Sequence, residues 1–130
     1  MIDFKNPFFV KLRPLDDEEK EEAEILVRKM LVDGEEIFAT FKGVRDMVIF
    51  TNKRAMAVNV QGIGKKVDYT SLPYSRVQAF SVETVGAFDR DCEVQLWFSG
   101  LGCVKFEFSG SSRGWFDIKA FNRYIANYIL

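Results

Sequence analysis

The 130-residue sequence contains no histidine, only two cysteines and only three prolines. The absence of histidine excludes Ser-His-Asp triads, Cys-His dyads and metal sites built on imidazole ligands. No stretch approaches the roughly 20 consecutive apolar residues that a membrane-spanning helix needs. An acidic residue, Asp3, stands near the N-terminus, and no long apolar segment follows it as in a secretory signal peptide. These absences predict a cytoplasmic protein.

The two cysteines, Cys92 and Cys103, are expected to remain free thiols. They lie on two predicted strands that a turn at residues 99–102 joins, so that Cys103 would face about Phe98 and Cys92 about Ser109. This pairing separates the two sulfur atoms by about 20 Å along the hairpin. A disulfide requires Cα atoms within about 7 Å of each other. The hairpin therefore predicts that no bridge forms.

Hydrophobic residues make up 48% of the chain and aromatic residues 15%, which is typical of one globular domain with a thick core. The charge is balanced in sum, at −1, but unevenly distributed. Residues 16–36 hold ten acidic residues against three basic ones. The sequence pI of about 5.5 argues against nucleic-acid binding, because domains that bind nucleic acid have pI values above about 9.

The pattern of apolar residues predicts an arm, a helix, a series of strands and a second helix, in that order. Residues 1–15 form an apolar arm that Pro7 and Pro14 keep from being helical; it would pack on its own domain or on a neighbouring subunit. Residues 16–32 predict an amphipathic helix with a capping box at its start. Residues 112–130 predict a second helix. Seven strands are predicted between them, at residues 35–42, 47–51, 54–60, 65–70, 76–84, 93–98 and 103–108.

These elements predict a mainly β (α+β) fold. Seven short strands at regular spacing indicate an antiparallel barrel or sandwich. The C-terminal helix would cap one open end of this barrel, and the N-terminal helix would be an addition to it. We expect residues 1–32 to form the arm and helix, and residues 33–130 to form the single globular unit.

No motif of the sequence points to catalysis. The segment Gly62-Ile63-Gly64-Lys65-Lys66 is too short for a phosphate-binding loop and precedes a strand instead of a helix. Asp89-Arg90-Asp91 with Glu93 offers too few oxygen ligands for calcium. The serines and cysteines have no neighbouring base to activate them. We therefore expect no enzyme activity, no cofactor and no metal.

Basic residues gather at the predicted strand turns. Such a cluster could bind anionic lipid headgroups or an acidic partner. It could equally pair within the chain, with Asp46, Asp68 and the acidic helix. The sequence leaves both interpretations open. The residues of the cluster are Lys42, Arg45, Lys53, Arg54, Lys65 and Lys66.

Residues 33–130 carry several distinctive motifs. They are Asp33-Gly34-Glu35, Lys42-Gly43-Val44-Arg45-Asp46, Phe50-Thr51-Asn52-Lys53-Arg54, the segments 61–66, 69–74 and 80–86, Asp89-Arg90-Asp91 and Glu93. With these motifs the segment resembles the bacterial pleckstrin-homology domain family. Two positions, Ile63 and Cys92, depart from the usual pattern. The resemblance implies a pleckstrin-like barrel without known enzymatic activity.

The resemblance also implies closed, ring-shaped homo-oligomers, with a pentamer as the expected size. Strands of adjacent protomers would meet in the ring and present a polar surface to a protein partner. Carried over onto this sequence, that surface comprises Lys42, Arg45, Asp46, Asn52, Lys53, Arg54, Lys65, Lys66 and Asp68.

A peripheral membrane module that binds anionic headgroups through the basic hairpin ends is the alternative function. Specific phosphoinositide binding is not expected, because Asp46 directly follows Arg45 and partly neutralises a short turn. The fold alone does not carry that function over to this chain.

Overall fold

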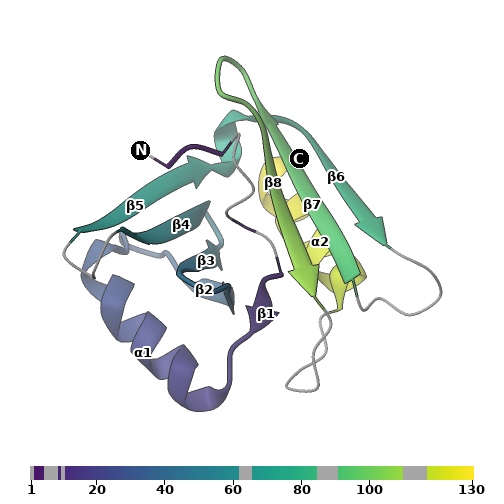
Figure 1. Cartoon of the computed structure of the whole chain (residues 1–130). Coiled ribbons are helices and arrows are strands. Elements are labelled where there is room, and N and C mark those ends of the chain that lie inside the picture. Colours follow the sequence, from purple (N-terminus) through teal and green to yellow (C-terminus); the bar gives the residue numbers. More distant parts are fainter. Residues whose placement is uncertain (1, 5–8, 10, 62–65, 85–90, 110–116) are drawn as a thin grey trace.

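The computed structural model describes residues 2–4, 9, 11–61, 66–84, 91–109 and 117–130 (Figure 1). Two antiparallel sheets form the protein, a five-stranded sheet in the order β1-β2-β3-β4-β5 and a three-stranded sheet in the order β6-β7-β8. The first sheet comprises β1 (Arg13–Pro14), β2 (Ile37–Lys42), β3 (Asp46–Thr51), β4 (Arg54–Gln61) and β5 (Lys66–Pro73). The second comprises β6 (Val77–Thr84), β7 (Asp91–Phe98) and β8 (Gly102–Ser109). The helices are α1 (Asp17–Val27), the 3-10 turns η1 (Arg28–Met30) and η2 (Tyr74–Arg76), and α2 (Ile118–Ile129).

The seven predicted strands correspond to β2 through β8, so the predicted fold class is confirmed. Both cysteines are free, as expected. The predicted pairing of the last hairpin was wrong by one residue, because Cys103 lies opposite Trp97 and Cys92 opposite Phe108. The reason is that Gly102, which the sequence placed in the turn, already pairs with Phe98, so the turn holds three residues instead of four.

The inner faces of the two sheets enclose an aromatic core that α2 closes on one side. Phe50 of β3 contacts Phe106 of β8 and Phe121 of α2, with ring centroids 5.7 and 4.7 Å apart. α2 buries Ile118, Phe121 and Ile125 at helical spacing. The predicted start of this helix at residue 112 was too early. The helix begins at Ile118 because the Asp117 carboxylate caps it by accepting a hydrogen bond from the Ala120 amide at 3.0 Å.

α1 lies on the outer face of the five-stranded sheet (Figure 1). The predicted capping box is present, since the Glu19 amide donates to the Asp16 carboxylate at 2.8 Å and the Asp16 amide to the Glu19 carboxylate at 3.3 Å. The helix is shorter than predicted and continues as η1 after Val27. Only Ala23 and Val27 are buried, so the wider apolar face that the sequence predicted is not buried in full.

The described part of the arm packs on its own domain. It crosses from β5, where the Ile2 amide donates to the Thr70 hydroxyl at 3.3 Å, to β2, with which β1 pairs. Between these points it runs beside β8. The amides of Leu12 and Glu107 donate to the carbonyls of Glu107 and Phe9 at 2.9 and 2.8 Å. The arm thus links β8 of one sheet to β2 of the other.

Lys11 of the arm has a strained backbone conformation. Its φ of 56° lies in the left-handed region, and its side chain is exposed. Residues other than glycine occupy that region at a cost of about 1 kcal/mol. Lys11→Gly should therefore keep or raise the free energy of unfolding, by up to about 1 kcal/mol, in urea titrations.

Lys20→Gly is the matched control, since Lys20 is also an exposed lysine but lies within α1. Glycine inside a helix should lower the free energy of unfolding by about 1 kcal/mol. Equal losses in the two variants would show that the arm does not need the left-handed conformation.

Candidate functional site

The structure divides the predicted polar surface between the two ends of the five-stranded sheet. The β3–β4 turn, with Asn52 and Lys53, lies at one end of the strands, and the β2–β3 turn, with Arg45, lies at the other. β3 spans six residues between them, so the ends are about 20 Å apart. Lys66 lies at the same end of the sheet as Arg45. Gln61 at the end of β4 pairs with Lys66, and the amide of the preceding Val60 donates to the Arg45 carbonyl. Within one chain, the described residues of the predicted surface therefore fall into two groups, one at each end of the sheet.

At the first end, Arg54 forms a buried clamp with Glu35. The Arg54 Nε and Nη2 atoms each lie 2.9 Å from a Glu35 carboxylate oxygen. The Glu35 side chain is fully buried. The Thr51 hydroxyl donates to Glu35 at 2.7 Å, and Arg54 also donates to the Met30 carbonyl at 2.8 Å. The clamp fixes the segment between η1 and β2 onto the β3–β4 hairpin.

Asn52 completes the same attachment. Its side-chain oxygen accepts from the Glu36 amide at 2.8 Å, and its Nδ2 donates to the Gly34 carbonyl at 3.0 Å. Gly34 has a φ of 78°, which suits the tight turn that these bonds hold. The polar groups of Asn52 and Arg54 therefore stabilise the fold through hydrogen bonds within the chain. Of the three residues predicted in this turn, Lys53 presents an exposed side chain.

Burial raises the pKa of the Glu35 carboxyl, but the hydrogen bonds from Arg54, Thr51 and the Val32 amide outweigh burial and hold that pKa below its ordinary value. Glu35 thus carries a negative charge that Arg54 neutralises inside the protein. A buried ion pair with its hydrogen bonds satisfied is a structural feature and offers nothing to a ligand.

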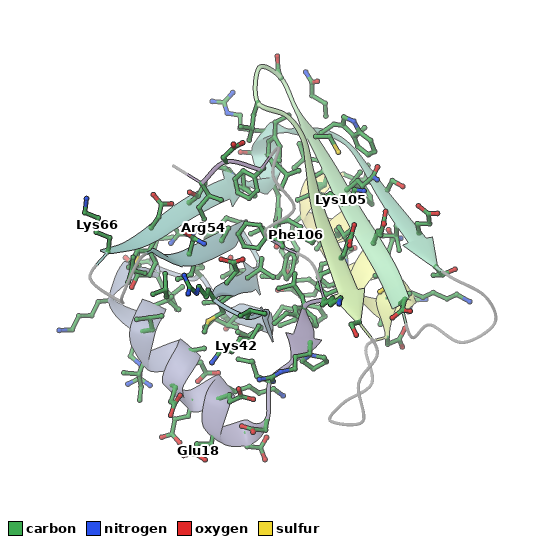
Figure 2. The ribbon with its side chains drawn as sticks, in the orientation of Figure 1. Glu18, Lys42, Arg54, Lys66, Lys105 and Phe106 are labelled. Atoms are coloured by element: carbon green, nitrogen blue, oxygen red, sulfur yellow. The ribbon has the colours of Figure 1, made fainter. Side chains whose placement is uncertain are left out.

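At the second end, three cations lie at the ends of strands β2, β3 and β5. Lys42 ends β2, Arg45 lies in the next turn and Lys66 starts β5, where Figure 2 shows it pointing away from the protein. Within the part of the chain that the structure describes, none of the three forms an ion pair. The predicted Lys65 lies outside the described residues.

The two predicted acids at this end accept hydrogen bonds from neighbouring strand side chains. The Asn59 amide donates to Asp46, and the Thr70 hydroxyl donates to Asp68 at 2.6 Å. Burial raises the pKa of Asp46, and the hydrogen bond from Thr70 lowers the pKa of Asp68. Lys42 is close enough to Glu19 of α1, and Arg45 to Asp46, to lower the pKa values of those carboxyls by charge attraction. We call Lys42, Arg45 and Lys66 the basic rim.

A cavity of about 350 Å³ lies where the chain passes from β5 through η2 to β6. We call it the corner cavity. Its lining includes Leu72 of β5, Arg76 of η2, Phe98 of β7 and Leu101 of the β7–β8 turn. No local pattern of the sequence predicts this cavity, because its walls come from β5, η2 and the distant β7–β8 hairpin.

Neither a metal site nor a membrane-spanning helix is found among the described residues. They contain no group of three or more Cys, Asp or Glu side chains placed to hold a metal ion. No described helix is both long and apolar enough to cross a bilayer. The candidate sites are therefore the basic rim and the corner cavity.

Glu35→Gln should lower the free energy of unfolding by about 3 kcal/mol, since it leaves the Arg54 charge buried and unpaired. Glu36→Gln is the control, because Glu36 is exposed and its change should stay within about 0.5 kcal/mol. Denaturant titrations of both variants measure the difference. A loss no larger for Glu35→Gln than for Glu36→Gln would contradict the clamp.

The clamp also predicts how stability depends on pH. The pKa of Glu35 is lower in the folded protein than its value of about 4.3 in the unfolded chain. Its stabilisation is therefore complete above that pH and is lost as the pH falls through the folded-state pKa. The gap in stability between wild type and Glu35→Gln should close below about pH 4.

Comparison with known proteins identifies the domain. The family description "Bacterial PH domain" matches residues 8–129. Two Bacillus subtilis proteins, named as the uncharacterized proteins YjqA and YozO, are similar. YjqA is 50% identical over 72 residues, which are 55% of this chain and 58% of YjqA. YozO is 36% identical over 67 residues, which are 52% of this chain and 59% of YozO. The matched part thus spans less than two thirds of either relative.

Solved structures give the same assignment. A DUF1696 family protein with a pleckstrin-homology domain from Shewanella loihica is 33% identical, with 93% of this chain and 99% of that chain covered and a TM-score of 0.72. A pleckstrin homology domain from Shewanella amazonensis is 36% identical over 89% of this chain and 92% of that chain, with a TM-score of 0.61. The chain belongs to the bacterial pleckstrin-homology domain family.

Proposed function

We propose that this domain is a non-enzymatic interaction module that assembles into a ring-shaped homo-oligomer and presents a polar surface to a protein partner. The free edge of β6 carries the proposal. β6 is eight residues long and is the outermost strand of its sheet. No backbone hydrogen bond within the described ranges crosses its outer side. Such an edge is a template for a strand of another chain.

The side chains of β6 leave this edge open. Ala79, Ser81 and Glu83 are exposed, and β6 contains neither a lysine nor a proline, the residues that commonly block edge strands. On the inner face, Phe80 and Val82 pack against the core but stay only partly buried. A strand added to β6 would complete their burial.

If the β6 strands of two copies paired with each other, the assembly would contain only two chains. A ring forms when β6 meets a different surface of the next copy and the rotation closes. The resemblance to the bacterial pleckstrin-homology family favours this form, with five protomers expected. The basic rim, Lys42, Arg45 and Lys66, lies on the other sheet and would remain open to a partner (Figures 1 and 2).

Light scattering on a sizing column, over a hundredfold range of concentration, tests the assembly. We expect one species of several protomers that resists dilution. A 15.0 kDa monomer throughout would contradict the proposal.

Two proline variants test the edge itself, Ser81→Pro and Val82→Pro. Successive amides of a strand point to opposite edges, so one variant removes an outward amide and the other an inward amide. The variant that loses an inward amide should have a lower melting temperature, because the proline removes a hydrogen bond to β7. The variant that loses an outward amide should keep the melting temperature of the wild type and should be a monomer. A stable outward variant that still assembles would exclude β6 from the interface.

The basic rim favours a second candidate, a peripheral membrane module, because its three cations lie at one end of the same sheet and form no ion pair among the described residues. Each basic residue near an anionic membrane contributes about 1 kcal/mol. Arg45→Glu/Lys66→Glu should therefore weaken binding to phosphatidylserine vesicles at least about tenfold.

Vesicle sedimentation at low and high salt measures this binding, which should fade as salt rises. Lys105→Glu/Lys119→Glu is the control, with the same charge change on the second sheet and on α2. No sedimentation of wild type at low salt, or equal loss in both variants, would rule the membrane function out.

A further inference from the structure

We propose that the corner cavity binds an extended peptide segment of a partner protein that carries a large apolar side chain and, close to it, a carboxylate. The inference goes beyond the proposed assembly, because every group of the site belongs to one chain. Three features carry it: an apolar hollow, the part of the β5 edge beside the hollow, and an arginine that forms no ion pair within the described ranges.

The hollow is apolar at its base. Leu72 and Phe98 are core side chains that are only 3% and 7% exposed, and Leu101 adds a partly buried wall from the hairpin tip. The volume of about 350 Å³ falls within the range of about 300–1,000 Å³ that is common for ligand sites. A hollow of this size admits one large aliphatic or aromatic side chain.

The free edge belongs to β5, which lines the cavity from Thr70 to Pro73. β5 pairs with β4 along its whole length and is the outermost strand of its sheet. The N-terminal segment lies beside this edge at Thr70, where the Ile2 amide donates to the Thr70 hydroxyl at 3.3 Å (Figure 1). From Ser71 to Pro73, no backbone hydrogen bond of the described residues reaches the edge. A peptide that pairs with this edge would send alternate side chains to the face where Leu72 lines the hollow.

The charge of the corner selects an acidic partner. Arg76 lines the cavity, is exposed and has no ion pair in the described parts of the chain. Its planar guanidinium can hold a carboxylate through two parallel hydrogen bonds. Lys53 lies nearby, since its carbonyl accepts from the Tyr74 amide at 3.1 Å, and it too is exposed. A basic peptide would be repelled here.

Thr70 does not compete for the peptide. Its hydroxyl already donates to Asp68 at 2.6 Å and accepts from the Ile2 amide at 3.3 Å. The other polar side chains that line the cavity are Ser71, Ser99 and Arg76, of which Arg76 alone carries a charge.

Fluorescence polarisation with labelled eight-residue peptides tests the site. The probe carries Phe at its centre and Glu two residues later, and two comparison peptides replace Phe by Ser or Glu by Lys. We expect saturable binding of the probe and at least about tenfold weaker binding of both comparison peptides, because each loses one of the two anchors.

Variants of the protein locate the binding. Arg76→Gln should weaken it about tenfold or more, the loss expected for a hydrogen bond to a charged group, and Leu101→Ser should weaken it as well. Arg123→Gln on α2 and Val44→Ser in the β2–β3 turn are the matched controls and should leave it unchanged. Methyl NMR signals of Leu72 and Leu101 should shift with the probe, while that of Val44 should not.

Binding that ignores Phe, Glu or Arg76, or that shifts signals at the basic rim instead, would overturn the proposal. Binding by the monomeric β6 proline variant but not by assembled wild type would also overturn it, since a second copy would then occupy β5. A monomeric wild type that binds the probe would support the peptide site while the ring fails. The two proposals therefore fail separately.

Discussion

The hydrogen bonds between the arm and β8 close the side of the barrel that the order of the strands leaves open. The two sheets are joined directly at the corner where β5 passes through η2 into β6. On the opposite side β2 and β8 are far apart in the sequence, and the arm bonds to both of them. Its apolar side chains Phe9 and Leu12 lie in the same core as the sheets. The shape of the barrel, and hence the position of its free edges, depends on this contact.

Polar residues have two different uses in this small domain. Arg54 and Asn52 form hydrogen bonds within the chain and fix the segment before β2. At the other end of the sheet lie Lys42, Arg45 and Lys66, which form no ion pair in the described part of the chain. The difference follows from burial: a charge at the covered hairpin must be neutralised, whereas one at a solvent-facing turn need not be.

The outer edges of β5 and β6 diverge from one corner, and the two proposed docking sites lie along them (Figure 1). Strand addition supplies main-chain hydrogen bonds that are independent of sequence, so selectivity must come from side chains beside the edge. β6 has only partly covered apolar residues beside it, which suits a copy of the same chain. β5 has a hollow and Arg76 beside it, which suits a peptide with matching chemistry.

The sequence by itself determined the seven strands, the capping box of Asp16 and Glu19, the free thiols and the family, because each depends on local spacing or on a contiguous motif. It did not determine the one-residue shift at Cys103, the late start of α2 or the burial of only part of α1. Only the tertiary structure decided that Arg54 reaches Glu35, 19 residues away, and that Arg76 shares a cavity with Leu101. These contacts join separate segments, and the packing of the two sheets, not the local pattern, sets which side chains meet.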